Sequence, residues 1–483
     1  MARMNAKLAG GVVGALVVVE GTSGVLQGYY TPLLTDIARH LGIHDADVNW
    51  LEAAQLLLSA IVVPVLARLG DIIGHRKVLL ASLLVTAVAS WSLAFAPSFP
   101  LYILAWAIQG FYVVWLPLNI AIIHSRARDR EDGAALTRKG AGVIVAALQA
   151  GAILGALAGG QLGGMLPLWA TLSVPAVLVT VAFLVVLLKV PDTGVRREGS
   201  VDTLGAVILT LSLVALTGGL SLVRADGFTP WVAVVIAIGA LLMWLFVRVE
   251  GAKQDPLVDI ALIKSPTVWP VILTAALFGV SVLGAQGPLS TFARTDPSEV
   301  GYGLGLTSAT ASYLIGAYVM SLLVGALLFA RLSARFSPRG VLIAASFLVA
   351  GGYLALIPLH GSTAVVVGCM VVAGLGSGAL VAALPAAAAS AAPAHQTAMA
   401  TGLTNTTKTI GGTFASAAFA VALVSGATAG AGESTAGTLS GYMTVWAICG
   451  GTAIVAALCL FAVPKVAFQH NIDAVEAEAA GAR

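Results

Sequence analysis

Charged residues and cysteines are both scarce in this sequence. Asp, Glu, Lys and Arg make up 10% of the 483 residues and hydrophobic residues make up 59%, whereas charged residues make up about 25% of an average soluble domain. This shortage excludes a soluble globular protein. The cysteines lie in apolar segments without the spacing of a metal motif, so we expect no disulfide framework, metal site or bound cofactor. They are Cys369, Cys449 and Cys459.

Long polar segments are also missing, and long apolar runs take their place. A helix needs about 20 apolar residues to cross a hydrocarbon core about 30 Å thick. The runs do not alternate in polarity as the strands of a membrane β-barrel do. The sequence therefore predicts an all-α integral membrane protein with fourteen transmembrane helices. These spans begin near residues 8, 48, 77, 100, 140, 167, 203, 230, 268, 306, 340, 363, 402 and 441.

Basic residues are distributed unevenly between the two sets of loops. With fourteen spans both termini share one side, and nearly all of the 25 Lys and Arg residues fall there. The opposite side has only Arg39, Arg224 and Arg294. Because basic loops stay in the cytoplasm, we expect a multi-pass protein of the cell membrane with both termini cytoplasmic.

The two ends of the chain resemble each other. ARLGDIIGHRKVLL (67–80) pairs with ARLSARFSPRGVLI (330–343), and GFYVVWLP (110–117) pairs with GALVAALP (378–385). Such repeats are common in transporters and imply a cavity between two halves. The predicted organisation is an N-terminal six-helix half (1–190), a linker with an inserted helix pair (191–267), a C-terminal six-helix half (268–465) and a cytoplasmic tail (466–483).

A third pairing concerns a lysine inside the apolar sequence. Lys139 and Gly142 match Lys408 and Gly411 at nearly the same separation as the other pairs. Since Lys139 marks the cytoplasmic start of its span, the repeat predicts that Lys408 also lies at a membrane interface.

The segment ARLGDIIGHRK resembles the signature G-x-L-x-D-R/K-x-G-R/K-R/K between the second and third helices of the major facilitator superfamily. Asp71, Gly74, Arg76 and Lys77 match it, and Ala67 replaces the first glycine. Glycine permits a tight turn at the membrane face. The resemblance implies a gating loop whose charges hold one conformation of two rocking halves. A plain interfacial turn is the alternative.

The fifth span, GAILGALAGGQLGG, has glycines spaced four residues apart, which lie on one helix face and let another backbone approach closely. It is similar to the antiporter signature of exporters in this superfamily, G-x-x-x-G-P-x-x-G-G, although Ala156 occupies the proline position. Ordinary helix packing explains the pattern equally well. The matching residues are Gly151, Gly155, Gly159 and Gly160.

The fourth span carries part of a signature that the superfamily associates with proton coupling, R-x-x-Q-G. Gln109 and Gly110 match it, and Trp106 occupies the arginine position. Together with fourteen spans, the motifs resemble the fourteen-helix drug:proton antiporter family. That resemblance implies proton-coupled efflux of small amphiphilic or cationic drugs by alternating access.

Glu20 is the most unusual charge, because it lies about twelve residues, or about 18 Å, into the first span. Carboxylates inside a membrane are costly and indicate function by default. We expect Glu20 to take up and release protons as its access to water alternates, unless it is a protonated packing residue. Glu52, near the outer end of the second span, is a second candidate with even odds.

Polar and aromatic side chains of other spans are expected to line a substrate cavity. Each of them is as well explained by bridging between helices, and the aromatic ones by contact with lipid. The candidates are Gln27, Gln55, Gln109, Tyr112, Trp115, Asn119, Gln286, Tyr313 and Tyr318, with Gln149 and Asn405 as further members of the group.

Other classes of function are weaker interpretations. The sequence contains no GxxxxGK[ST], HExxH or GxSxG motif, which disfavours an ATP-driven pump and a membrane enzyme. A proton-coupled uptake or metabolite transporter of the same fold stays open, as does a non-transporting receptor or structural protein. We expect a monomer whose partners are the lipid bilayer, a small-molecule substrate and protons, and no nucleic acid.

Overall fold

The computed structural model describes residues 2–127, 133–192, 194, 201–253, 256, 258–392, 397–425 and 435–462. Every regular element among them is a helix. The predicted tail (466–483) and most of the linker that follows Pro191 lie outside the described residues.

The first part of the chain forms a helical group that we call the N-terminal half. Two of its membrane passes are broken into shorter helices, one after Tyr29 and one at Gln109. Its elements are α1 (Ala2–Tyr29), η1 (Thr31–Leu33), α2 (Leu34–Leu41), η2 (Asp45–Asp47), α3 (Val48–Ile73), α4 (His75–Phe95), α5 (Phe99–Gln109), η3 (Gly110–Val114), α6 (Trp115–Ala127), α7 (Gly133–Gly163) and α8 (Leu168–Lys189).

Two further helices follow, α9 (Thr203–Asp226) and α10 (Pro230–Glu250), and then a second group that we call the C-terminal half. Its first long pass is interrupted by η4 (Val280–Gly284), a π-helical turn. Its other elements are α11 (Ile260–Lys264), α12 (Trp269–Gly279), α13 (Gln286–Arg294), α14 (Pro297–Val300), α15 (Ser308–Arg335), α16 (Pro338–Leu359), α17 (Thr363–Ala391), α18 (Thr397–Ala422) and α19 (Leu439–Ala462).

The apolar runs of the sequence become membrane-length helices. Thirteen stretches of the described residues are long and apolar enough to cross a membrane. The fourteenth predicted span corresponds to α18, which has 26 residues but carries the polar sequence TGLTNTTKT in its first half. The prediction of an all-α membrane protein is therefore confirmed, and the count of fourteen is consistent with the helices found.

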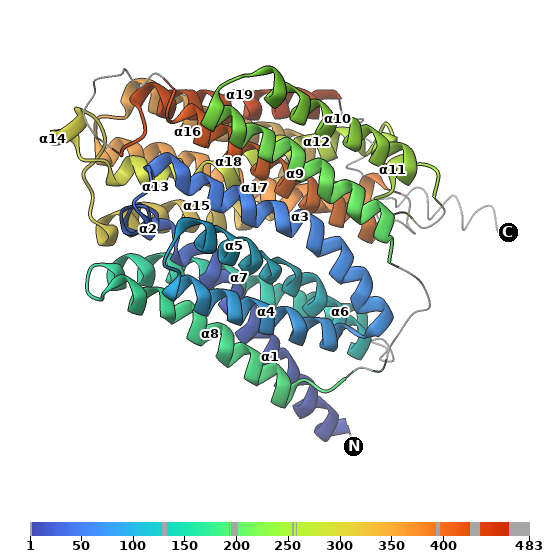
Figure 1. Cartoon of the computed structure of the whole chain (residues 1–483). Coiled ribbons are helices and arrows are strands. Elements are labelled where there is room, and N and C mark those ends of the chain that lie inside the picture. Colours follow the sequence, from blue (N-terminus) through green and yellow to red (C-terminus); the bar gives the residue numbers. More distant parts are fainter. Residues whose placement is uncertain are drawn as a thin grey trace.

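The two halves lie side by side and meet along two seams (Figure 1). At one seam α3 of the N-terminal half packs on α18, and at the other α7 packs on α15. The inserted helix α9 contacts both α3 and α18, so the inserted pair covers the first seam from outside. The buried apolar residues form two main clusters, one within the N-terminal half and one centred on the C-terminal half.

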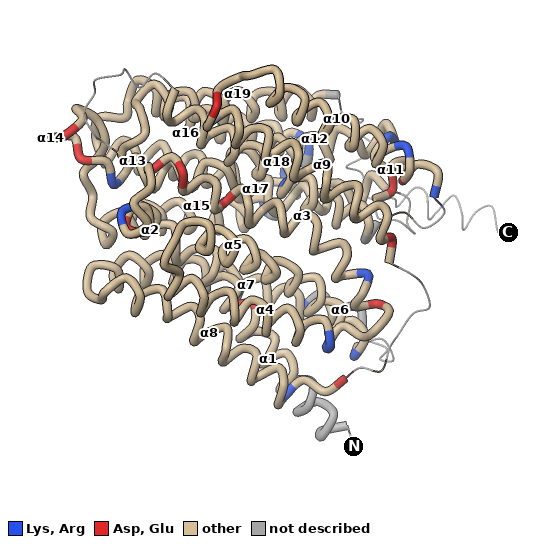
Figure 2. Tube along the Cα trace, in the orientation of Figure 1, with Lys and Arg blue, Asp and Glu red and all other residues tan. Residues whose placement is uncertain are grey.

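The bundle has two distinct ends. We call the end where α1 begins the N-terminal end and the opposite one the far end. Figure 2 shows most of the described Lys and Arg residues at the N-terminal end and a small cluster beside α2 and α13 at the far end. Arg39 and Arg294 belong to that far cluster.

Glycines allow the same close helix contact in both halves. A methyl group at Gly24 of α1 would lie 1.9 Å from the Leu148 carbonyl oxygen on α7, and one at Gly279 of α12 would lie 2.0 Å from the Lys408 carbonyl oxygen on α18. Only glycine tolerates such a backbone approach. Gly28 makes the same contact one turn further along α1, where a methyl group would lie 2.2 Å from the Ala152 carbonyl oxygen. The α1–α7 and α12–α18 pairs therefore pack alike, and Lys408 corresponds to Leu148 or Ala152.

This equivalence corrects the predicted place of Lys408. The sequence repeat paired it with Lys139, near the beginning of α7, and so predicted an interface. The structure places Lys408 near the middle of α18, opposite Gly279, where its counterpart on α7, Leu148 or Ala152, is apolar. The interface prediction was wrong because a short match of Lys and Gly was taken as the register of the whole helix.

Candidate functional site

Glu20 is completely buried in the middle of α1. Its Oε1 accepts a hydrogen bond of 2.8 Å from Asn119 Nδ2 on α6. Its Oε2 and the Asn119 Oδ1 are both buried without a hydrogen-bond partner among the described residues. An unsatisfied buried carboxyl oxygen is costly, and a proton on it would lower that cost. The structure thus brings two of the predicted site residues together.

Glu52 has different surroundings. It lies in the second turn of α3, is half-buried, and forms no hydrogen bond or ion pair with any described residue. Glu20, by contrast, has no exposed surface. The two predicted carboxyls therefore occupy separate sites that differ in burial.

Gln109 is the centre of a buried polar network in the N-terminal half. Its amide Nε2 donates to the Tyr30 hydroxyl and to Ser90 Oγ, both at 2.9 Å. The ring of Tyr30 contacts that of Trp106, with 4.9 Å between centroids. Trp106, which stands at the arginine position of the proton-coupling signature, is thus part of an aromatic contact that fixes the end of α1 against α5.

Three more predicted cavity residues also pack within the N-terminal half. Gln55 Nε2 donates to the Trp106 carbonyl oxygen at 3.4 Å. Trp115 is fully buried and its indole N–H donates to Ser82 Oγ at 3.1 Å. Tyr112 is 7% exposed and its ring contacts that of Trp115 edge to face. Trp115 therefore anchors α6 to α4 and has no exposed surface in this structure.

The remaining predicted residues are scattered. Gln27 is exposed on α1, and the half-buried Gln286 bonds back to the Val282 carbonyl oxygen on η4. Tyr318 is buried inside the C-terminal half. Tyr313 is 60% exposed and accepts a hydrogen bond from Gln161 of α7, so it bridges the two halves at the protein surface.

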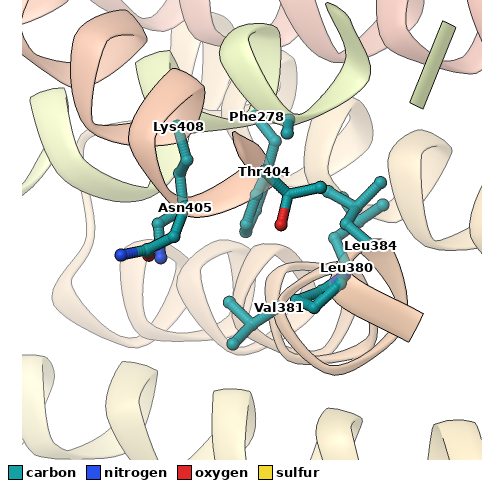
Figure 3. A pocket seen from close by; sticks show the side chains of 9 residues that line it. Phe278, Leu380, Val381, Leu384, Thr404, Asn405 and Lys408 are labelled. Atoms are coloured by element: carbon teal, nitrogen blue, oxygen red, sulfur yellow. The ribbon is translucent and has the colours of Figure 1, made fainter. Parts of the chain in front are cut away.

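The Lys408 pocket, which we define by the residues that line it, was missed by the sequence analysis. It lies between α12, α17 and α18 (Figure 3), with Lys408, Asn405 and Thr404 as its polar members. Asn405 was predicted as a cavity residue, whereas Lys408 was assigned to an interface. Its lining residues are Ala275, Phe278, Leu380, Val381, Leu384, Pro385, Thr404, Asn405 and Lys408.

The loop between α3 and α4 is a tight turn fixed to α8. Gly74 has φ +108°, which favours glycine. His75 Nε2 lies 3.1 Å from Asp71 Oδ1, and Arg76 donates to the carbonyl oxygens of Leu187 and Val190 at the end of α8. Lys77 is exposed. The predicted gating residues thus share one turn at the N-terminal end.

The glycine ladder has two faces. Methyl groups at Gly151 and Gly159 would lie 2.1 Å and 2.0 Å from carbonyl oxygens of α1, and Gly155 also faces α1. One at Gly160 would instead lie 2.4 Å from the Ser308 carbonyl oxygen on α15, in the other half. Three predicted glycines therefore build the N-terminal half, and the fourth builds a seam between the halves.

The two halves are joined at the far end. Arg294 of α13 forms an ion pair with Asp36 of α2, and Ser290 Oγ donates to the Thr31 carbonyl oxygen on η1. The Asp45 amide donates to the Thr435 carbonyl oxygen at 2.8 Å. These contacts, which the sequence analysis did not predict, close the far end.

Toward the N-terminal end, α3 is packed less closely against other helices. Residues 61–69 of α3 are all only half-buried, and Figure 1 shows the two halves diverging in this direction. Nearer the far end, the Leu56 side chain of α3 would lie 3.1 Å from a methyl group at Gly412 of α18. The structure is thus closed at the far end and less tightly joined at the other.

The sequence matches the family model of the Major Facilitator Superfamily over residues 16–416 and 297–480. The chain belongs to the Major Facilitator Superfamily. It is accordingly a multi-pass membrane transporter of small molecules and not an enzyme, and the resemblance inferred from its motifs is confirmed.

Relatives with assigned names include efflux and resistance proteins. This transporter is 28% identical to a multidrug efflux pump of Mycolicibacterium smegmatis over 76% of this chain and 73% of that protein. It is 26% identical to a puromycin resistance protein of Streptomyces alboniger over 92% and 88% of the two chains.

Solved structures of other transporters share the fold. The nucleoside transporter NupG aligns with 94% of this chain and 99% of its own, with a TM-score of 0.67 and 15% identity. A peptide transporter aligns with 94% of this chain and 95% of its own, with a TM-score of 0.67 and 16% identity. At such identity these likenesses show the fold alone.

Proposed function

We propose that this transporter exports small amphiphilic drugs or antibiotics, cationic ones among them, in exchange for protons by alternating access. The observation that carries the proposal is Glu20, a buried carboxyl with one oxygen bonded to Asn119 and the other unpartnered among the described residues. A proton on that oxygen neutralises the charge and removes the cost of burying it.

The direction of transport is supported by the relatives. The two described above are named as an efflux pump and a resistance protein. The charge distribution supports cytoplasmic termini, with the N-terminal end of the bundle in the cytoplasm. The structure then corresponds to a state closed to the outside. In this state Glu20 is buried, and water would reach it from the cytoplasmic side.

The residue roles belong to the same proposal. Glu20 carries the coupled proton, while Glu52, being half-buried and unpaired, serves as a second proton acceptor near the outside. The α3–α4 turn with Asp71, Gly74, Arg76 and Lys77 is the cytoplasmic gating element. Rocking of the halves exposes each carboxyl to one side of the membrane at a time.

The test is transport in liposomes that contain the purified protein. With an acidic interior, we expect ethidium or puromycin to accumulate and protons to leave as the compound enters. An uptake symporter would instead expel the compound under this gradient and accumulate it with an alkaline interior. A receptor or structural protein would give no flux above that of empty liposomes under either gradient.

A further inference from the structure

Lys408 is a charged side chain that the proposed mechanism does not use. It lies near the middle of α18, and it is the charged member of the pocket lining. No described residue forms a hydrogen bond or ion pair with its ammonium group. Arg76, Lys253 and Arg294, by contrast, all meet carbonyl or carboxylate oxygens. A strongly hydrated ammonium near the middle of a membrane helix requires a counter-charge or water.

The pocket faces the other half of the protein. Lys408 lies one helical turn before Gly412, on the same side of α18. At Gly412 an added methyl group would lie 2.7 Å from Leu283 of η4 and 3.1 Å from the Leu56 side chain of α3, which belongs to the N-terminal half. The ammonium therefore stands on the face of α18 that borders the seam, where a molecule between the halves can reach it.

The chemistry of the lining suits an amphiphile with an acidic end. Figure 3 shows the Lys408 and Asn405 side chains leaving α18 in the same direction. They supply an ammonium and an amide, both hydrogen-bond donors. Phe278, Leu380 and Leu384 supply an apolar wall beside them. A carboxylate can bond to Lys408 and Asn405 while its hydrocarbon part lies against that wall.

We propose that the Lys408 pocket binds the anionic group of the transported molecule. The inference rests on the proposed export function and adds that, among the transported amphiphiles, those with an acidic group, including zwitterions, are preferred. Permanent cations without an acidic group are poorer substrates, because a second positive charge near Lys408 is repelled strongly where water is scarce.

The test uses rhodamine B and its ethyl ester, which differ only in whether the carboxylate is free. Binding is measured by fluorescence anisotropy with the full chain in phosphatidylcholine nanodiscs, against empty nanodiscs, without a pH gradient. We expect the unmodified protein to bind the acid more tightly. Lys408→Met should weaken binding of the acid about tenfold, the size of a lost charge-assisted hydrogen bond, and leave binding of the ester within about twofold.

Two further variants guard against a folding artefact. Lys408→Arg keeps the charge and should keep the preference for the acid. Asn405 is exposed, so the Asn405→Leu variant should fold. It should weaken binding of the acid only, and by a smaller factor than Lys408→Met does. The proposal would be overturned if Lys408→Met weakened binding of the acid and of the ester equally. It would also be overturned if the unmodified protein bound the acid no more tightly than the ester, or bound neither dye.

Lipid is a second source of the same anionic chemistry. This source is tested by repeating the measurement in nanodiscs that contain phosphatidylglycerol. If this lipid competes with the acid, and Lys408→Met abolishes the competition, the pocket binds a lipid phosphate and the substrate role is wrong. Liposome flux separates this inference from the proposed function. If the protein prefers the acid but shows no gradient-driven flux, only the proposal of proton-coupled export is wrong. If it shows gradient-driven flux but no preference for the acid, only the assignment of the pocket is wrong.

Discussion

The two halves of this transporter use the same backbone packing to present opposite charges. Gly24 on α1 and Gly279 on α12 allow equivalent close contacts with α7 and α18. Beside the first contact lies Glu20, sealed and bonded to Asn119. Beside the second lies Lys408, in a pocket. Shared packing therefore fixes the depth of both groups, and the local side chains decide which one is closed off.

The halves also differ in the helix that carries the contact. In the N-terminal half α1 runs without a break to Tyr29, whereas α12 passes into the π-helical turn η4 at Val280. Such turns widen a helix locally and often occur at functional sites. The break follows Phe278, which lines the pocket, so it lies beside the ligand site proposed for the C-terminal half.

The largest expected effect comes from removing the acidic member of this pair. Glu20→Gln keeps the size of the side chain but cannot carry a proton in exchange for substrate. We expect gradient-driven transport to fall to the level of empty liposomes, while substrate binding stays within about twofold. Transport with an acidic interior and equilibrium binding, measured on the same preparation, check both parts.

Glu299→Gln is the matched control for that experiment. Glu299 is an exposed carboxylate of α14 at the far end, so the same chemical change there should leave transport unchanged. If Glu20→Gln still couples substrate to the pH gradient, the assignment of Glu20 to the proton is wrong, and Glu52 becomes the leading acidic residue.

The next effect tests whether the two halves are packed alike. Gly24→Ala and Gly279→Ala each push a methyl group to about 2 Å from a carbonyl oxygen of the facing helix. We expect each to lower stability by about 1–3 kcal/mol or more, as overpacking does. Thermal unfolding in detergent, followed by size-exclusion chromatography, measures the loss.

Gly14→Ala and Gly402→Ala are the controls, since no atom lies within 4 Å of the added methyl group at either position. Both should unfold at the temperature of the unmodified protein. A loss in only one of Gly24→Ala and Gly279→Ala would mean that the halves do not share this contact, and the correspondence of Lys408 to Leu148 or Ala152 would fail with it.

Composition and spacing were enough to predict the helices and much of the packing. The long apolar runs predicted membrane helices, and glycines four residues apart on α7 form the face that packs on α1. Gly160 breaks that pattern because it is one position off the ladder and turns to α15. Spacing within one helix says which residues share a face, but not which helix of the other half covers the next face.

The candidate site was harder to predict because its parts come together only in three dimensions. The depth of Glu20 could be counted from the start of its span, but its bond to Asn119 spans 99 positions of sequence. Lys408 was misplaced because identical residues were aligned where the backbones are not equivalent. Trp115 and Tyr313 were hard to assign because an aromatic side chain in a membrane helix fits core, lipid and cavity equally well.

Gly160 offers a way to separate the halves without touching either charge. Gly160→Ala places a methyl group 2.4 Å from the Ser308 carbonyl oxygen across the seam. We expect the far end to open. Spin labels at Met165→Cys and Ser362→Cys, both exposed at the far end of opposite halves, report this as a longer distance in a background whose three native cysteines are replaced.

The control for the seam is Gly164→Ala, where the nearest atom would be 3.6 Å away and the distance distribution should not move. Unchanged distances in Gly160→Ala would show that α7 and α15 adjust locally and that this contact does not hold the halves together.

The smallest expected effect concerns the ion pair that joins the halves at the far end. Arg294 is 9% exposed and Asp36 is 28% exposed, so solvent screens the pair and it contributes about 1 kcal/mol. Asp36→Asn should therefore shift the population toward the open far end by about fivefold, a smaller shift than that of Gly160→Ala. The same two labelled positions measure it.

The exchanged pair, Asp36→Arg with Arg294→Asp, is the control. It should restore closure if the attraction between the two charges is what matters. If the exchanged pair stays as open as Asp36→Asn, then the hydrogen bond of Arg294 to the Leu306 carbonyl oxygen, which orients α13, contributes more to closure than the charge of Asp36.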